Sequence, residues 1–369
     1  MKPTITLCMI VKNESRVILE CLNSVYKHLD YWVISDTGST DNTKELIIDF
    51  FKEKNIPGEF ADLEWKGFGH NRTHALTACK GKADYAWMID ADDKLIGEFV
   101  LPENTIADAY QLCLGNIWNT SWRSQIFKTE SDWFYVGVLH EYPHTNKPDY
   151  INIKLVGDYK IDIRTVGARN ANISVIEKYS IDAEILETAL KEEPDNDRYW
   201  FYLAQSYFDS GQFYKAEKTY KKRASMGRFN QEVFYSLWRM GICREYIERP
   251  DHEVIEAYLH AYESVPSRAE SLYQLSKLYR LKYDKPAIAY MYAKAAYDIP
   301  YPENGLFVSD YIYKFGILNE ISITASYANQ HKIGYDVTEE LLTKNKKYIM
   351  DNELEHLTSN LEFYSKNLS

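Results

Sequence analysis

Short apolar runs that alternate with helix-like stretches constrain the fold of this chain more than any other feature. Four runs of strand length occur in the first quarter of the sequence: 4–11, 31–35, 59–63 and 83–90. The run 4–11 is apolar and rich in β-branched residues, as in a strand that is covered on both faces. Strands that alternate with helices form mostly parallel sheets with helices on both faces. We therefore expect an α/β domain.

Helical spacing and turn residues separate these runs. Segment 36–41 is dense in turn formers, and Asp41 is a suitable N-cap for a helix over 43–53. Another helix is expected over 69–79. A first helix follows residue 15, where apolar residues recur at roughly helical spacing: Val17, Leu19, Leu22 and Val25.

Three of the expected strand ends carry distinctive polar groups. Asn13 and Glu14 follow the first strand, Asp36 ends the second, and the acids of 90–93 end the fourth. In open parallel sheets, ligands bind beyond the carboxyl ends of the strands. We therefore expect these groups to face one ligand site.

The sequence changes character near residue 172, where strand-like runs vanish. Residues at the offsets of a tetratricopeptide repeat, a helix–turn–helix unit of about 34 residues, then appear: Trp200, Leu203, Ala204, Tyr207, Gly211, Ala216 and Tyr220. Phe234 heads a second, looser copy, and a third begins near Leu272. One repeat cannot bury its own apolar face, so stacking is required.

These patterns divide the chain into four segments. We expect an α/β domain over 1–171, a linking helix over 172–198, tetratricopeptide-like repeats over 199–300, and a helical end-piece over 301–369 that frays near its end. The predicted fold class is thus a mostly parallel α/β domain followed by an all-α repeat domain. A terminal repeat leaves one face uncovered, and a homodimer through the repeats is one way to cover it.

Charge and cysteine content exclude several classes of protein. The 43 basic and 54 acidic residues give a net charge of −11, which argues against nucleic acid or an anionic membrane as a partner. No apolar run approaches the 18 or so residues of a membrane span. The five cysteines are scattered without a CxxC motif, so we expect neither disulfides nor a zinc cluster, and a cytoplasmic location.

The acidic end of the fourth strand predicts metal chemistry. Asp90-Ala91-Asp92 directly follows an apolar run, and alternation places the two carboxylates on one side of an extended chain. Such hard oxygen donors bind Mg²⁺ or Mn²⁺ and leave positions for phosphate oxygens. A metal there would neutralise charge on a departing diphosphate. A solvated acidic turn is the alternative.

Four motifs together resemble glycosyltransferase family 2. They are 6–14 (TLCMIVKNE), 35–43 (SDTGSTDNT), 69–72 (GHNR) and 88–92 (MIDAD). The resemblance implies a GT-A fold and an inverting transferase that uses a nucleoside-diphosphate sugar, most often a UDP-sugar. A following repeat region also resembles bacterial and viral transferases, including peptide S-glycosyltransferases. No QxxRW motif is present, because Trp122-Arg123 lacks the upstream Gln, which favours transfer of a single sugar.

The resemblance also implies roles for individual residues. Asp36 would accept from the uracil N3–H, unless it only caps its turn. Arg72 would contact the base or diphosphate, unless it is a surface cation of its helix. The full donor-binding set that we expect is Val11, Asn13, Glu14, Asp36, Arg72, Asp90, Ala91, Asp92 and Arg169.

A second segment, 133–143 (WFYVGVLHEYP), resembles the part that closes the site in a subset of this family. His140 would be a third metal ligand beside Asp90 and Asp92. Glu141 is the leading candidate for the general base that takes the acceptor proton, and Asp93 is the rival. Arg169 or Lys178 would meet the diphosphate, with a salt bridge at the domain junction as the alternative.

Three functions remain to be compared. The first is a metal-dependent glycosyltransferase that modifies a hydroxyl or thiol on a glycan or peptide. The second is an inactive scaffold that binds partners through its repeats. The third, a sugar nucleotidyltransferase, needs a glycine-rich loop after the first strand to hold a triphosphate. Loop 12–16 contains no glycine, so we do not favour that function.

Overall fold

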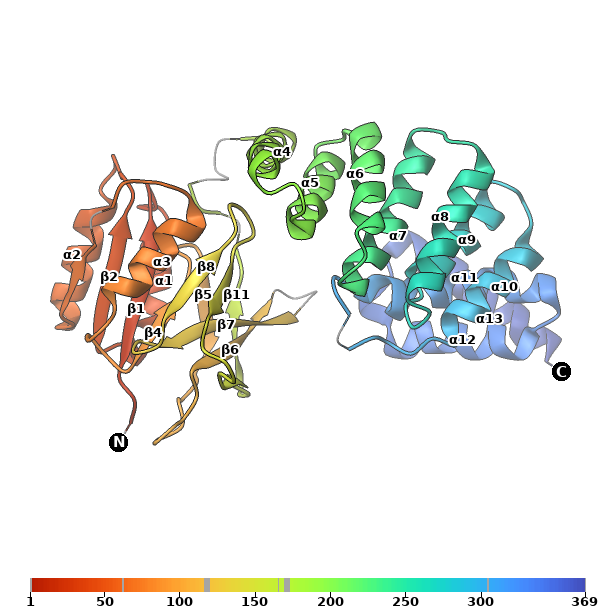
Figure 1. Ribbon diagram of the computed structural model, residues 1–369. Coiled ribbons are helices and arrows are strands. Elements are labelled where there is room, and N and C mark those ends of the chain that lie inside the picture. The colour runs from red at the N-terminus through yellow and green to blue at the C-terminus, as the bar shows by residue number, and fades with distance from the viewer. Residues whose placement is uncertain are drawn as a thin grey trace. The chain divides into compact units, whose positions relative to one another are not determined.

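The computed structural model describes residues 2–61, 63–115, 120–164, 166–168, 173–303 and 305–368. The chain divides into two compact units, Met1–Ile185 and Leu186–Ser369. The division falls within helix α4 (Val175–Glu192), inside the segment that the sequence predicts as a link. Figure 1 shows that the first unit holds the sheet and that the second is helical, in agreement with the predicted fold class.

The first unit is built on a mixed sheet with the strand order β3-β2-β1-β4-β7-β6-β11-β5, and β10 pairs with β6. The parallel half was predicted and comprises β1 (Ile5–Val11), β2 (Tyr31–Asp36), β3 (Gly58–Phe60) and β4 (Tyr85–Met88). The other half was not predicted, because its central strand β7 runs antiparallel to both β4 and β6. It comprises β5 (Lys94–Gly97), β6 (Ala109–Gly115), β7 (Thr120–Lys128), β10 (Asn152–Lys154) and β11 (Tyr159–Asp162).

Helices cover both faces of the parallel half. Alternate residues of β1, such as Leu7 and Met9, pack with α1 (Ile18–Val25) and α2 (Thr43–Lys54), and a short 3₁₀ turn η1 (Tyr26–His28) follows α1. Cys8 points the opposite way, into a second cluster with α3 (Phe68–Ala78). β1 is therefore buried on both sides, as its continuous apolar run predicts.

A hairpin of β8 (Trp133–Val136) and β9 (Tyr142–Thr145) packs against α3. A Cβ added at Gly69 would lie 2.6 Å from the Gly137 carbonyl oxygen, so only glycine permits this approach. The Thr73 hydroxyl also accepts from the Tyr135 N–H at 2.8 Å. These contacts fix the hairpin turn relative to α3.

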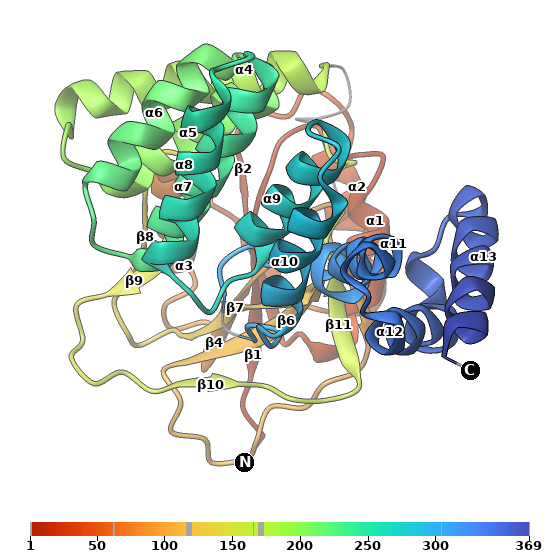
Figure 2. The ribbon, with the colours of Figure 1, turned by 90° about the vertical axis from the view of Figure 1, so that its right-hand side faces the viewer.

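The second unit is a succession of helices that pack side by side, as the two views of Figures 1 and 2 show. The predicted repeats correspond to three helix pairs: α5 (Asp197–Asp209) with α6 (Phe213–Ser225), α7 (Asn230–Tyr246) with α8 (Asp251–Ser264), and α9 (Glu270–Leu281) with α10 (Pro286–Tyr297). The end-piece is helical as expected: η2 (Ile312–Gly316), α11 (Ile317–Thr324), η3 (Ala325–Ala328), α12 (His331–Lys344), η4 (Lys346–Tyr348) and α13 (Asp351–Asn367). Among the helices of the described ranges, none combines the length and apolar character needed to cross a bilayer.

Tyrosine rings packed on glycines help to explain the 31 tyrosines of the chain. A Cβ added at any of three helical glycines would lie less than 3 Å from the ring of a tyrosine in another helix. The pairs are Gly241 with Tyr258, Gly316 with Tyr273, and Gly334 with Tyr364. Each ring fills the space left by the absent side chain, so neighbouring helices approach closely.

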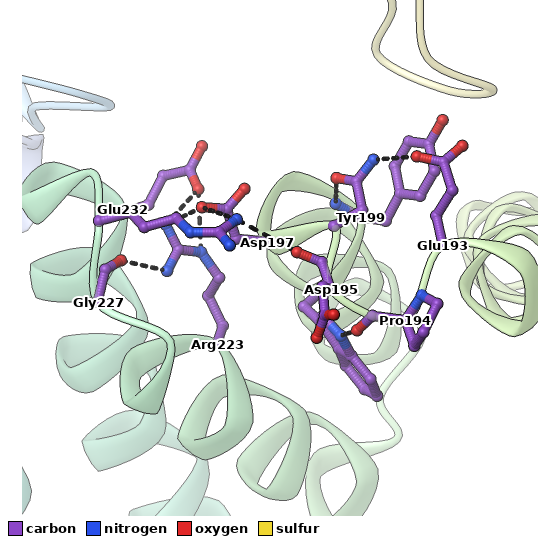
Figure 3. A network of polar contacts seen from close by, with 11 residues as sticks. Glu193, Pro194, Asp195, Asp197, Tyr199, Arg223, Gly227 and Glu232 are labelled. Atoms are coloured by element: carbon purple, nitrogen blue, oxygen red, sulfur yellow. Dashed lines mark hydrogen bonds and ion pairs between the residues drawn. The ribbon is translucent and has the colours of Figure 1, made fainter.

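A buried ion pair joins α6 to α7 (Figure 3). Arg223 has no exposed side-chain surface and donates to Glu232 Oε2 at 2.8 and 3.0 Å. Its third nitrogen donates to the Gly227 carbonyl oxygen at 3.0 Å. The guanidinium is thus satisfied by one carboxylate and one carbonyl, and Asp197 lies 3.9 Å away.

We predict that Glu232→Ala lowers the free energy of unfolding by about 3–5 kcal/mol, because it leaves a buried guanidinium without its main partner. Urea unfolding followed by circular dichroism measures this change. Asp298→Ala is the control: it removes the exposed partner of Lys294 on α10 and should cost far less. If Glu232→Ala lowers the free energy of unfolding no more than Asp298→Ala does, the Arg223–Glu232 pair does not stabilise the unit.

Candidate active site

The ends of β1, β2 and β4 lie side by side and bring the predicted polar groups together. Val11 stands opposite Asp36 in the β1–β2 register. The Ile89 N–H donates to the Cys8 carbonyl oxygen at 3.3 Å, which sets the end of β4 beside β1. The residues that follow these strands therefore share one edge of the sheet, as the rule for parallel sheets predicts.

Asp36 uses one carboxylate oxygen for its turn and leaves the other without a partner. Oδ1 accepts from the N–H groups of Gly38 and Ser39, both at 2.8 Å. Oδ2 is out of contact with solvent and forms no hydrogen bond with the described part of the chain. Turn capping, one of the two expected roles, is therefore present, and a second acceptor remains available to a ligand.

The loop after β1 is tied to the turn after β2. Asn13 has a left-handed backbone (φ 58°), and its side-chain oxygen accepts from the Thr40 N–H at 2.7 Å. The Glu14 N–H donates to the Thr43 hydroxyl at 2.9 Å, at the start of α2. The N-cap position of α2 is Asn42 and not Asp41, although the Asp41 carboxylate accepts from the Thr43 N–H.

Val11 and Ala91 contribute to the core and do not present side chains to a ligand. Their side chains are 3% and 5% exposed and belong to the cluster with α1 and α2. Val11 instead supplies its carbonyl oxygen, which accepts from the Thr37 N–H at 2.9 Å. Any contact of these two residues with a donor would therefore come from their backbone, and their place in the donor-binding set stays a prediction.

Glu14 and Asp92 converge on Gly167. A Cβ at Gly167 would lie 3.1 Å from Asp92 Oδ2 and 3.2 Å from both carboxylate oxygens of Glu14. The Gly167 N–H donates to Asp92 Oδ2 at 3.0 Å, and the Ala168 N–H donates to Glu14 at 3.2 Å. Burial raises the pKa of both carboxyl groups, and the charge of a neighbouring aspartate raises each further.

Arg72 joins three elements of the site. From α3, its Nη2 donates to Asp90 Oδ1 at 2.5 Å and its Nε donates to Glu141 Oε1 at 2.7 Å. The side chains of Arg72 and Glu141 are only 13% and 12% exposed. The alternative of a surface cation therefore does not hold: the guanidinium bridges the fourth strand end and the hairpin turn. Contact of Arg72 with the base or diphosphate stays a prediction.

Asp90 and Asp93 are three residues apart, and their pKa values are shifted in opposite directions. Burial raises the pKa of Asp90, but the nearby charges of Arg72 and Arg123 outweigh it and hold that pKa below its usual value. Burial, together with the charge of Asp90, raises the pKa of Asp93 to about 8. The side chain of Asp93 is only 1% exposed, which favours Glu141 over Asp93 as the general base.

His140 lies in the β8–β9 turn with a left-handed backbone (φ 51°) and an exposed side chain. Within the described ranges, no group of three His, Cys, Asp or Glu residues is arranged to hold a metal ion. The expected ligand set of Asp90, Asp92 and His140 is therefore not preassembled. Asp90 is paired with Arg72, and Asp92 with the Gly167 N–H.

The basic residues that follow β11 lie in different surroundings. Arg169 lies outside the described residues. Lys178 Nζ lies 3.9 Å from Asp182, four residues further along α4, so this ion pair is within one helix. Arg164, which the sequence analysis missed, donates to the Asp92 carbonyl oxygen and to Glu20, both at 2.6 Å. It fixes the acidic turn from the far end of the sheet.

Two other missed residues lie on β7, next to Asp90. Arg123 and Gln125 line a cavity of about 30 Å³ together with Arg72, Asp90, Tyr135 and Glu141. No local motif marks them, because they reach the site only through the antiparallel pairing of β7 with β4.

Comparison with known proteins identifies the domain that carries this site. The model of the family described as Glycosyl transferase family 2 matches residues 6–155. The SPbeta prophage-derived glycosyltransferase SunS of Bacillus subtilis is 22% identical over 279 residues, which cover 71% of this chain and 63% of SunS. A TPR repeat-containing protein of Synechococcus elongatus is 34% identical over 94 residues, 26% of this chain and 22% of that protein.

Among solved structures, the crystal structure of MamA aligns with 47% of this chain and 96% of MamA, at 15% identity and a TM-score of 0.36. The chain spans less than two thirds of the length of both curated relatives. The resemblance found in the motifs is confirmed to this extent: residues 6–155 match the Glycosyl transferase family 2 model, and 94 residues of the chain are similar to a TPR repeat-containing protein.

Proposed function

We propose that this protein is an inverting glycosyltransferase that moves a single sugar from a UDP-sugar to a hydroxyl or thiol on a glycan or peptide. The observation that carries the proposal is the shared edge of the sheet, where Asp36 at the end of β2 keeps one buried oxygen without a partner and the acidic turn 90–93 follows β4, with β1 between them. An N–H of a nucleobase would satisfy that oxygen. In this proposal the repeats bind the acceptor or a second copy of the chain.

We propose that two acidic residues at this edge contribute to a site for a divalent cation, although no complete ligand set is assembled among the described residues. Asp92 and Glu14 supply hard oxygen donors that approach the same point, and their pKa values are raised by burial first and by the charges of neighbouring acids second. We propose Asp92, with Asp90 or Glu14, as the residues that would hold Mn²⁺ or Mg²⁺. The bound ion would neutralise charge on the departing diphosphate.

Glu141 is proposed as the general base. Arg72 holds Oε1, whereas Oε2 forms no hydrogen bond with the described residues. As the acceptor oxygen or sulfur bonds to the anomeric carbon, its proton would pass to Oε2, and the bond from that carbon to the diphosphate would break on the opposite face. Arg72 acts as a positioning residue, because it fixes the carboxylate on the hairpin turn relative to Asp90.

We predict that the protein binds UDP more tightly with Mn²⁺ than without it, and that Asp92→Asn removes this difference. The amide cannot supply the charge that a hard cation prefers. Isothermal titration calorimetry with UDP, with and without Mn²⁺, measures the effect. Asp49→Asn, an exposed site on α2, is the control. Unchanged metal-dependent affinity in Asp92→Asn would exclude Asp92 from the cation site.

We predict that Glu141→Gln keeps UDP binding but lowers turnover by roughly 10²–10⁴, the usual contribution of a general base. The amide keeps an acceptor oxygen for Arg72 but cannot take a proton. UDP release from UDP-sugars with Mn²⁺, with water or a glycan as acceptor, measures turnover. Glu45→Gln, on the exposed face of α2, serves as control. Turnover near that of the unmodified protein would reject Glu141 as the base.

The same assay separates an enzyme from a scaffold. If the unmodified protein releases no UDP from any donor and binds no UDP in the presence of metal, an inactive domain that serves the repeats is the better description.

A further inference from the structure

The cavity beside Asp90 has an unusual lining. It is bordered by two guanidinium groups, Arg72 and Arg123, by two carboxylates, Asp90 and Glu141, and by the Gln125 amide. Its volume is about 30 Å³, more than the roughly 10–15 Å³ that one water molecule requires on the same measure. It can therefore admit a small polar group such as a hydroxyl or hydroxymethyl group.

Gln125 is buried in this cavity without a hydrogen bond. Its side chain is 2% exposed, and Oε1 is out of contact with solvent and has no partner. No other side-chain hydrogen bond of Gln125 is formed within the described part of the chain. Because an unsatisfied buried amide destabilises the folded state, the residue is best explained by a ligand that supplies the missing bond.

A local irregularity of the sheet aims Gln125 toward the cavity. Tyr110 of β6 pairs with Ile126, but the next residue, Gln111, pairs with Ser124. Gln125 is thus the extra residue of a β-bulge, a device that re-aims side chains and is common beside active sites. The bulge lies next to β4, which leads to Asp90.

The charges select the kind of group that the cavity accepts. Arg72 is neutralised by Asp90 and Glu141, whereas Arg123 forms no ion pair within the described ranges. The carboxylates would repel an anion, and the guanidinium groups would repel a cation. An apolar group would leave the buried amide without a hydrogen bond. A hydroxyl fits, because it donates to the Gln125 oxygen and accepts from the Arg123 guanidinium.

We propose that this cavity receives one hydroxyl or hydroxymethyl group of the carbohydrate bound between Asp90 and Glu141, and that Gln125 and Arg123 determine which sugar the protein accepts. This inference rests on the proposed glycosyltransferase function and adds its sugar-selecting residues. The group belongs either to the donor sugar or to an acceptor glycan, and the two sources can be separated.

The test compares the unmodified protein with Gln125→Met, which keeps the side-chain length and removes the amide. UDP-glucose, UDP-galactose and their N-acetylhexosamine counterparts identify the preferred donor, and monodeoxy analogues of that donor are then assayed for UDP release in water. A second arm uses p-nitrophenyl glycosides and their monodeoxy analogues as acceptors. Melting temperature and UDP affinity are measured for every variant.

We expect the unmodified protein to lose on the order of 10²-fold or more in kcat/KM on one deoxy analogue, because its polar groups are then left unpaired. Gln125→Met should treat that analogue and its parent alike, with melting temperature and UDP affinity unchanged or raised. Discrimination seen in water assigns the hydroxyl to the donor, and discrimination seen only with glycosides assigns it to the acceptor.

Several results would overturn the inference. One is a Gln125→Met variant that discriminates as well as the unmodified protein in both arms. Another is a lowered melting temperature with unchanged discrimination, since the amide would then serve packing. If Gln125→Met does not fold, Arg123→Met, at an exposed position, must show the same loss of discrimination. Failure of the unmodified protein to release UDP from any donor overturns the proposed function itself and is distinct from these outcomes.

Discussion

The organisation of the site depends on one guanidinium that serves two carboxylates. Arg72 stands on α3, Asp90 follows β4, and Glu141 follows the hairpin strand β8, so its two ion pairs connect parts of the chain that are 18 and 69 residues apart. These contacts form only because α3 and the hairpin approach through Gly69 and Gly137. Because the carboxylates are mostly shielded from water, the loss of Arg72 would leave two like charges facing one cavity. The close approach at the two glycines and the ion pairs of Arg72 therefore depend on each other.

The acidic turn shows how position relative to a cation changes the chemistry of identical side chains. Asp90 has Arg72 as a direct partner, and its pKa lies below the usual value. Asp92 accepts a hydrogen bond from a backbone N–H, and Asp93 keeps one oxygen without a partner. Burial raises the pKa of both carboxyl groups, and the charge of Asp90 raises both further. The turn thus carries more negative charge than its surroundings compensate. The Gly167 N–H, which lies beyond β11, donates to Asp92 and compensates part of this charge.

Sequence patterns predict the parts of this fold that depend on local signals. The parallel strands, their helices and the first repeat follow from apolar periodicity, and Asp36 and Asp90 are found because the ends of parallel strands meet at one edge. The pairing of β7 with β4 depends on contacts about 40 residues apart, for which a single sequence carries no local signal. Gln125 was therefore missed. The burial of Asp93 likewise has no local signal, since the backbone that hydrogen-bonds to it belongs to Arg164, after β11.

The unsatisfied acceptors indicate where folding and function conflict. Asp36, Asp93 and Gln125 each keep one side-chain oxygen away from solvent without a hydrogen bond. In a protein selected only for stability, apolar residues of similar size would be favoured at such positions. Asp36 and Asp93 lie at the strand edge, and Gln125 lines the cavity that reaches Asp90. Local breaches of the rules of packing are expected at functional sites, where a ligand completes the missing bonds. These three acceptors thus lie at the strand edge or at the cavity where we propose that the substrate binds.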